Sequence, residues 1–136
     1  MERRKKIRGK FLSELDVRVV GNRDWMTLAP LQYMSCDGNI HTVPPGIHTD
    51  FASLWYIPII SLHLSGKCNK DATLHDYYYK TGLIPRKDAD KLFREAIISN
   101  EVVWKWRTRK FVANFLYFGV RVFGRFSYKG KKEWNN

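Results

Sequence analysis

The sequence has only two cysteines among 136 residues, Cys36 and Cys68, and they do not form a CxxC pair. This scarcity excludes a disulfide-stapled miniprotein and favours reduced, part-buried thiols. Long hydrophobic runs are also missing. The longest, Phe111–Val120, has ten residues and includes Asn114, whereas a membrane-spanning helix needs roughly 20. Because no apolar stretch follows the charged first ten residues, we expect neither a signal peptide nor a transmembrane helix.

The composition is that of a folded domain. Apolar residues make up 44% of the chain and aromatic residues 15%, which excludes a disordered protein. A length of 136 residues suits one domain. We expect a basic N-terminal arm over residues 1–10, a single domain over residues 11–126 and a basic C-terminal tail over residues 127–136.

The net charge of +11 is concentrated at the two ends of the chain. Residues 1–10 carry a net charge of +5 and residues 102–136 carry +8, while the segment between them carries −2. Basic termini suit phosphate on nucleic acid, anionic lipid headgroups or an acidic protein neighbour. Charge alone does not choose among these partners.

The pattern of residues predicts strands first and helices afterwards. Strands are expected at 15–20 and 25–28, and the segments 31–36 and 39–43 form a hairpin with a two-residue turn at Asp37-Gly38. Helices are expected at 71–80, 86–99 and 102–126, with Gly82 and Pro85 separating the first two. The predicted class is α+β: a small antiparallel sheet, a helical hairpin, and an amphipathic, aromatic and basic C-terminal helix.

Candidate chemistry centres on the pair His75-Asp76. Adjacent helical residues face different neighbours, so the histidine can act on a substrate while the aspartate binds a cation. Tyr79 shares a face with His75, and Asp90 lies in the following helix. A buried aspartate on one imidazole nitrogen fixes the tautomer and leaves the other nitrogen basic.

Two resemblances follow from the motifs. The segments Val43–Ser53, Leu74-His-Asp-x-x-Tyr79, Thr81-Gly82 and Arg86–Asp90, in that order, resemble the domain-of-unknown-function family thirteen fifty-three. That resemblance implies a bacteriophage or prophage origin but no activity. The succession HDxxY and ADxxF is also similar to the phospholipase A-two superfamily, which implies a hydrolase acting at a membrane or cell envelope.

The second resemblance implies a role for each residue. His75 would be the general base that activates a water, Asp90 its orienting partner and Tyr79 the support of Asp90. Asp76 would bind Ca²⁺, and oxygens of the loop that contains Gly46 and Asp50 would complete the shell of six to eight ligands that calcium takes.

Other interpretations of the same residues stay open. His75 and Asp76 are also typical of a core hydrogen-bond arrangement, in a non-enzymatic virion component of the tail or baseplate. A zinc set of His48, Asp50 and His75 is a third possibility.

Aromatic and basic residues alternate at the start of the last predicted helix, at Trp104, Lys105, Trp106, Arg107, Arg109 and Lys110. They predict a surface that binds phosphate or an anionic membrane, with Phe111–Val120 partly inserted. The alternatives are stacking on nucleic-acid bases, which we favour less, and an aromatic core helix with solvated cations. We expect synthesis in the host cytoplasm, followed by peripheral membrane binding or incorporation into a virion.

Overall fold

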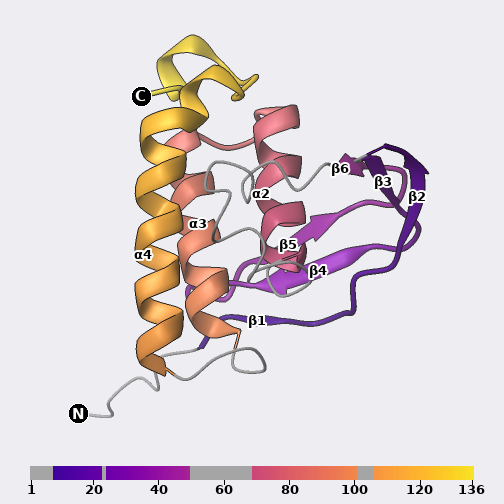
Figure 1. The fold of residues 1–136 in the computed structure, drawn as a ribbon, viewed down its shortest axis with the longest axis horizontal. Helices are drawn as coiled ribbons and strands as arrows, with labels where there is room; N and C mark the ends of the chain where they lie inside the picture. The colour runs from indigo at the N-terminus through magenta and orange to yellow at the C-terminus, as the bar shows by residue number, and fades with distance from the viewer. Residues whose placement is uncertain (1–7, 23, 50–68, 101–105) are drawn as a thin grey trace.

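The computed structural model describes residues 8–22, 24–49, 69–100 and 106–136. In these residues, short strands come first and three helices follow (Figure 1). The strands are β1 (Lys10–Phe11), β2 (Val17–Gly21), β3 (Asp24–Thr27), β4 (Leu31–Met34), β5 (Ile40–Val43) and β6 (His48–Thr49). The helices are α2 (Asn69–Thr81), α3 (Arg86–Ser99) and α4 (Trp106–Phe123), followed by 3₁₀ turns at Gly124–Phe126 and Lys132–Trp134. The protein is α+β, which confirms the predicted class.

The strands form two small antiparallel sheets where one was expected. One sheet has the order β1-β4-β5 and the other has the order β2-β3-β6. Strand β3 pairs with β6 through Trp25↔Thr49 and Met26↔His48, and Pro30 separates it from β4. The strand that continues from the Pro44-Pro45-Gly46 turn therefore completes the second sheet and brings Thr49 toward α2.

The β4–β5 hairpin closes with a three-residue loop, so the predicted two-residue turn at Asp37-Gly38 is wrong. The Ser35 N–H donates to the Asn39 carbonyl at 2.9 Å, which leaves Cys36, Asp37 and Gly38 in the loop. Gly38 has a φ of +87°, as expected for the residue that follows a type I turn in such a loop. The Asp37 carboxylate stabilises the longer loop by accepting hydrogen bonds from the Ser35 hydroxyl and the Asn39 backbone.

The helical hairpin lies close to its predicted position. The sequence pattern predicts a second helix over residues 86–99, and α3 covers the same residues. Helix α2 ends at Thr81 because Gly82 takes a left-handed φ of +61°, and its N–H donates to the Tyr78 carbonyl. Helix α4 ends at Phe123 in place of the predicted residue 126 and continues as a 3₁₀ turn.

The helices stand side by side, with α3 between α2 and α4 (Figure 1). The β1-β4-β5 sheet crosses α2 and reaches α3, whereas the β2-β3-β6 sheet lies beyond α2. One cluster of buried residues joins α2 and α3 to the β1-β4-β5 sheet and includes Leu31, Tyr33, Val43, Leu74 and Leu92. A second cluster joins α2, α3 and α4 through Ala72, Phe93, Ile97, Ala113, Leu116 and Val120. The candidate site lies where these two clusters meet, between α2 and α3.

Candidate functional site

The helical hairpin brings His75 of α2 against Asp90 of α3. The His75 Nε2 lies 2.8 Å from the Asp90 Oδ1, and the Tyr79 hydroxyl donates to the same oxygen at 2.5 Å. All three side chains are buried, and Asp90 has no exposed surface. The hydrogen bond that the sequence predicts between His75 and Asp90 is confirmed, and so is the contact of Tyr79 with Asp90.

Local sequence explains this convergence. His75 and Tyr79 are four residues apart on α2, so they share a face, and the turn at Gly82 folds α3 back along that face. The imidazole ring packs against two aromatic rings, with centroid distances of 4.1 Å to Tyr79 and 4.7 Å to Phe93. The ring is therefore held in one orientation by packing as well as by the hydrogen bond.

Two arginines bind the other oxygen of Asp90. The Arg121 Nη1 donates to Oδ2 at 2.8 Å, and the Arg86 Nη1 lies 3.5 Å from the same atom. Cationic groups thus compensate a carboxylate that would be costly to bury alone. Sequence reasoning missed both. Arg86 carried a readable signal, its i,i+4 spacing from Asp90, whereas Arg121 lies 31 residues farther along the chain.

Arg86 also joins three parts of the chain. Its Nη1 donates to the Val120 carbonyl at 3.0 Å, and its Nε donates to the Asn135 carbonyl at 3.1 Å. Its side chain is 4% exposed. Arg86 therefore connects α3 to the end of α4 and to the C-terminal segment, where Tyr128 is also buried.

Tyr79 is a permanent donor to Asp90. Burial raises the pKa of the Tyr79 phenol far above its usual value, and the charge of the neighbouring Asp90 carboxylate raises it further. The phenol therefore keeps its proton at any physiological pH. Tyr79 also lies close to Gly124, where an added Cβ would come within 2.5 Å of the Tyr79 hydroxyl oxygen.

Asp76 projects toward the β6 segment, away from Asp90. The Thr49 hydroxyl donates to the Asp76 Oδ2 at 2.5 Å, and both residues are buried. The expected proximity of Asp76 to the loop after β5 is confirmed at Thr49. Gly46 lies in the preceding turn with a φ of +83° and donates its N–H to the Thr27 carbonyl. Asp50 lies outside the described residues.

The zinc set is not assembled in the part of the chain that the structure describes. His48 is exposed and pairs with Asp24 at 3.0 Å, whereas His75 is buried against Asp90. Among the described residues, no group of three or more His, Cys, Asp and Glu side chains is arranged to hold a metal ion.

The predicted phosphate-binding residues divide between two sides of α4. Arg107 and Lys110 are exposed, whereas Arg109 lies on the buried side and is 6% exposed. Trp104 and Lys105 lie outside the described residues, and Trp106 begins the helix. Arg109 therefore belongs to the interior, which is a correction to the predicted surface.

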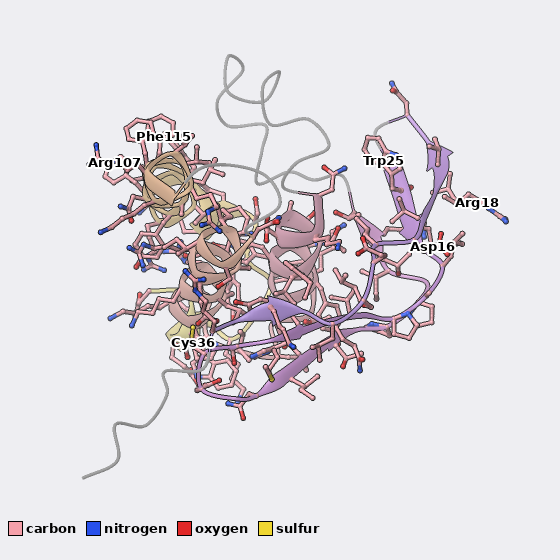
Figure 2. The ribbon with its side chains drawn as sticks, turned by 90° about the horizontal axis from the view of Figure 1, so that it is seen from below. Asp16, Arg18, Trp25, Cys36, Arg107 and Phe115 are labelled. Atoms are coloured by element: carbon pink, nitrogen blue, oxygen red, sulfur yellow. The ribbon has the colours of Figure 1, made fainter. Side chains whose placement is uncertain are left out.

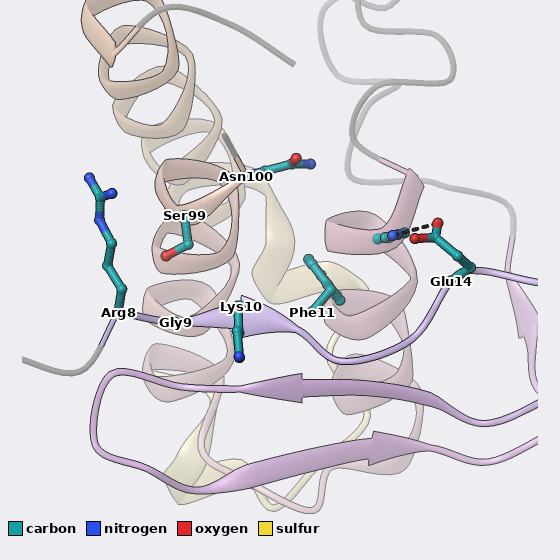
Figure 3. A pocket seen from close by; sticks show the side chains of 8 residues that line it. Arg8, Gly9, Lys10, Phe11, Glu14, Ser99 and Asn100 are labelled. Carbon is teal, nitrogen blue, oxygen red and sulfur yellow. Dashed lines mark ion pairs between the residues drawn. The ribbon is translucent and has the colours of Figure 1, made fainter. Parts of the chain in front are cut away.

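A separate pocket of about 440 Å³ opens between β1 and the end of α3 (Figure 3). Lys70 at its wall is paired with Glu14 at 2.8 Å and lies over the Phe11 ring. The C-terminal end of α3 also faces this pocket through Ser99 and Asn100, and the helix dipole there disfavours anions. None of the predicted site residues lines it, so the candidate site remains the His75–Asp90 region.

Comparison with known proteins places the chain in a family. Residues 25–120 match the family described as "Protein of unknown function (DUF1353)". The protein belongs to this family. No curated protein and no solved structure gives a significant match. The matched segment includes His75, Asp76, Tyr79 and Asp90, so the candidate site is part of the family region. These comparisons do not show the predicted similarity to the phospholipase A-two superfamily.

Proposed function

We propose that this protein is a phospholipase A-two-like hydrolase that cleaves lipid esters with His75 as the general base. The observation that carries the proposal is the buried hydrogen bond between the His75 Nε2 and the Asp90 Oδ1, at 2.8 Å. It is supported by Tyr79, which donates to the same oxygen. A histidine oriented by a carboxylate, with an adjacent aspartate aimed elsewhere, is the arrangement that the HDxxY and ADxxF motifs imply.

The proposed chemistry follows from the tautomer. In the proposed mechanism the Nε2–H donates to Asp90, and Nδ1 is the nitrogen that acts as the base. The Nδ1 takes a proton from a water molecule as the water oxygen attacks the ester carbonyl. The resulting imidazolium then returns that proton to the leaving alkoxide as the ester bond breaks. Asp90 stabilises the imidazolium in between, while Arg121 and Arg86 hold Asp90 in place.

Calcium is part of the proposal through Asp76. A carboxylate and a neighbouring hydroxyl are hard oxygen donors, the type that Ca²⁺ prefers, and Asp76 and Thr49 lie together at the loop. Asp76 would hold the ion, with oxygens of the loop that contains Gly46 and Asp50 as further ligands. When bound, calcium would supply a positive charge for the oxyanion that develops on the ester carbonyl.

Hydrolysis of a soluble short-chain phospholipid, in the presence of calcium, tests the proposal. We expect His75→Gln to lower the rate at least about 100-fold, because general-base catalysis contributes roughly that much or more. The matched control is His48→Gln, which changes an exposed histidine paired with Asp24 and should keep the rate. A wild-type rate no higher than background, or equal rates in the two variants, would overturn the proposal.

Titration calorimetry tests the calcium site without reference to activity. We expect heat of binding from the wild type and from Asp88→Asn, which changes an exposed aspartate of α3, and none from Asp76→Asn. Far-ultraviolet circular dichroism checks that each variant is folded. Equal heats in both variants, or no heat from the wild type, would remove calcium from the site.

A second candidate function is a non-enzymatic tail or baseplate component of a virion. It is favoured by the position of Asp90, whose four partners come from α2, α3 and α4 and lock these helices together. A structural component of a particle requires helices that are held rigidly together, and it does not need to turn over a substrate. If this is the function, mass spectrometry of purified phage particles should find the chain in a fixed ratio to the other particle proteins. If the protein is instead a hydrolase that acts away from the particle, the chain should be absent from the particles.

A further inference from the structure

Helix α4 has two apolar faces, and within the described part of the chain one of them is buried and the other is exposed. The inner face carries Ala113, Leu116 and Val120, which are at most 2% exposed. The outer face carries Phe111, Phe115, Phe118 and Val122, whose exposed fractions are 66%, 38%, 68% and 43%. Their spacings of four, three and four residues place them along one side of the helix. We call these four residues the outer stripe.

The outer stripe faces away from the other helices and the sheets that the structure describes. Helix α4 lies at the edge of the helical layer, with α3 on one side of it (Figure 1). Viewed almost along the helix, Phe115 and Arg107 point outward from α4, away from α3 (Figure 2). The rings of Phe111 and Phe115 stack on each other at 6.1 Å. The stripe extends over about 17 Å, since a helix rises roughly 1.5 Å per residue.

Basic residues accompany the stripe and acidic residues do not. Helix α4 contains Arg107, Arg109, Lys110 and Arg121, and it has no aspartate or glutamate. Arg107 and Lys110 are exposed beside the stripe. Arg125 follows the helix, and its guanidinium lies 4.9 Å from the ring of Phe126, which is 79% exposed. The surface of α4 therefore combines large aromatic side chains with positive charge.

This combination fits an anionic lipid surface best. Phenylalanine rings can enter the boundary between headgroups and acyl chains while arginine and lysine bind the lipid phosphates. A second copy of the chain would bring two rows of cations together, which charge repulsion opposes. Bases of a nucleic acid could stack on single rings, but Val122 offers them no stacking plane.

We infer that the outer stripe of α4, with Arg107, Lys110 and Arg125, is a docking surface for an anionic membrane. The inferred binding is at the membrane surface. No helix among the described residues is long and apolar enough to span a membrane. The inference deepens the proposed function, on which its biological role rests, because it names the surface that presents the lipid substrate. Binding itself requires no hydrolysis and is measured separately.

Sedimentation with vesicles of phosphatidylglycerol and phosphatidylcholine tests the inference. We expect Phe111→Ser combined with Phe118→Ser to weaken binding to anionic vesicles at least about tenfold. The matched control combines Val19→Ser and Leu83→Ser, two apolar residues that are 68% and 59% exposed elsewhere, and should bind as the wild type does. We also expect His75→Gln to bind normally, so that loss of hydrolysis and loss of docking are distinguishable.

A charge series sharpens the test. Replacing Arg107 and Lys110 by glutamine should weaken binding about fivefold per cation at low salt, and the effect should fade as salt is added. Lys87→Gln combined with Lys91→Gln, on the exposed side of α3, is the control. Three results would overturn the inference: no vesicle binding by the wild type, equal loss in stripe and control variants, or a stable dimer that the Phe111 and Phe118 changes dissociate in light scattering.

Discussion

The α2–α3 hairpin and the outer side of α4 depart from ordinary burial in opposite directions. The hairpin buries Asp90, His75 and Asp76, all of which are at most 6% exposed, whereas α4 exposes Phe111 and Phe118 to about two thirds of their surface. Buried polar groups and exposed aromatic groups are each unfavourable unless something compensates them. In the hairpin the compensation is internal, through hydrogen bonds and two arginines. On α4 we expect it to come from the membrane surface inferred above.

The two regions are joined by one helix. Arg121 lies on α4 and donates to Asp90, so the helix that carries the outer stripe also holds the carboxylate that orients His75. We therefore assign the two proposed activities to different regions: the hydrogen-bonded hairpin to the proposed chemistry and the outer stripe of α4 to the inferred docking.

Asp90→Asn should be the most destabilising single change. Asparagine keeps the shape of the side chain but leaves Arg86 and Arg121 without their buried anion, which typically costs about 3–5 kcal/mol. Urea unfolding measures the loss. Asp88→Asn, an exposed change two residues away, should cost less than about 1 kcal/mol. Similar losses in both variants would show that the buried network is not what distinguishes the hairpin.

The two faces of α4 should respond very differently to the same substitution. Leu116→Ala removes a side chain that is 2% exposed and should cost about 2–5 kcal/mol through the cavity that it leaves. Phe118→Ala removes a larger side chain that is 68% exposed and should change stability by about 0.5 kcal/mol or less. Thermal or urea unfolding compares them. A large loss in Phe118→Ala would mean that the outer stripe packs against the protein itself.

The stability of the protein should respond with opposite signs to alanine at Gly119, within α4, and at Gly124, just after it. An added Cβ at Gly124 meets the Tyr79 hydroxyl oxygen at 2.5 Å, so Gly124→Ala should displace Tyr79 from Asp90 and cost about 1–3 kcal/mol. At Gly119 the added Cβ meets no atom within 4 Å, and Gly119→Ala should stabilise the helix by about 0.5–1 kcal/mol. Stabilisation by both changes would contradict the close packing of Tyr79.

The smallest expected effect is that of Tyr78→Phe on the free energy of unfolding at alkaline pH. Burial raises the pKa of Tyr78 to about 12 from an ordinary value of 10.0. The unfolded chain then loses the Tyr78 proton at a lower pH than the folded chain does. The stabilisation is fully present below pH 10 and is lost as the pH rises toward 12. Tyr78→Phe should therefore make the decline of unfolding free energy between pH 10 and 12 shallower, by on the order of 1 kcal/mol. Parallel curves would contradict the raised pKa.

Local patterns were sufficient to predict the helical hairpin. The periodicity of residues 86–99, the stop at Gly82 and the four-residue spacing of His75 and Tyr79 are all readable within one or two helical turns. The His75–Asp90 pair followed from them because a short turn forces the helices to lie antiparallel. The aromatic and basic character of the last helix was also predicted, but periodicity could not tell which of its two apolar faces would be buried.

The features that were missed depend on distant parts of the chain or on competing local bonds. Arg121 reaches Asp90 only because α4 packs along α3, and no sequence spacing encodes that contact. The buried position of Arg109 has the same origin. The division of the strands into two sheets depends on β6 pairing with β3, whose partner residues lie 22 and 24 positions earlier in the chain. The Asp-Gly pattern predicts a two-residue turn from backbone preferences alone. The loop is longer because the Asp37 carboxylate forms hydrogen bonds with Asn39.

One measurement tests the comparison most directly: the release of fatty acid from a soluble short-chain phospholipid and from phosphatidylglycerol vesicles, by the wild type, His75→Gln and the Phe111→Ser/Phe118→Ser double variant. We predict that His75→Gln loses both activities and that the double variant loses only the activity on vesicles. No fatty-acid release by the wild type from either substrate would contradict the hydrolase. Equal activity of the wild type and the double variant on vesicles would contradict the docking surface.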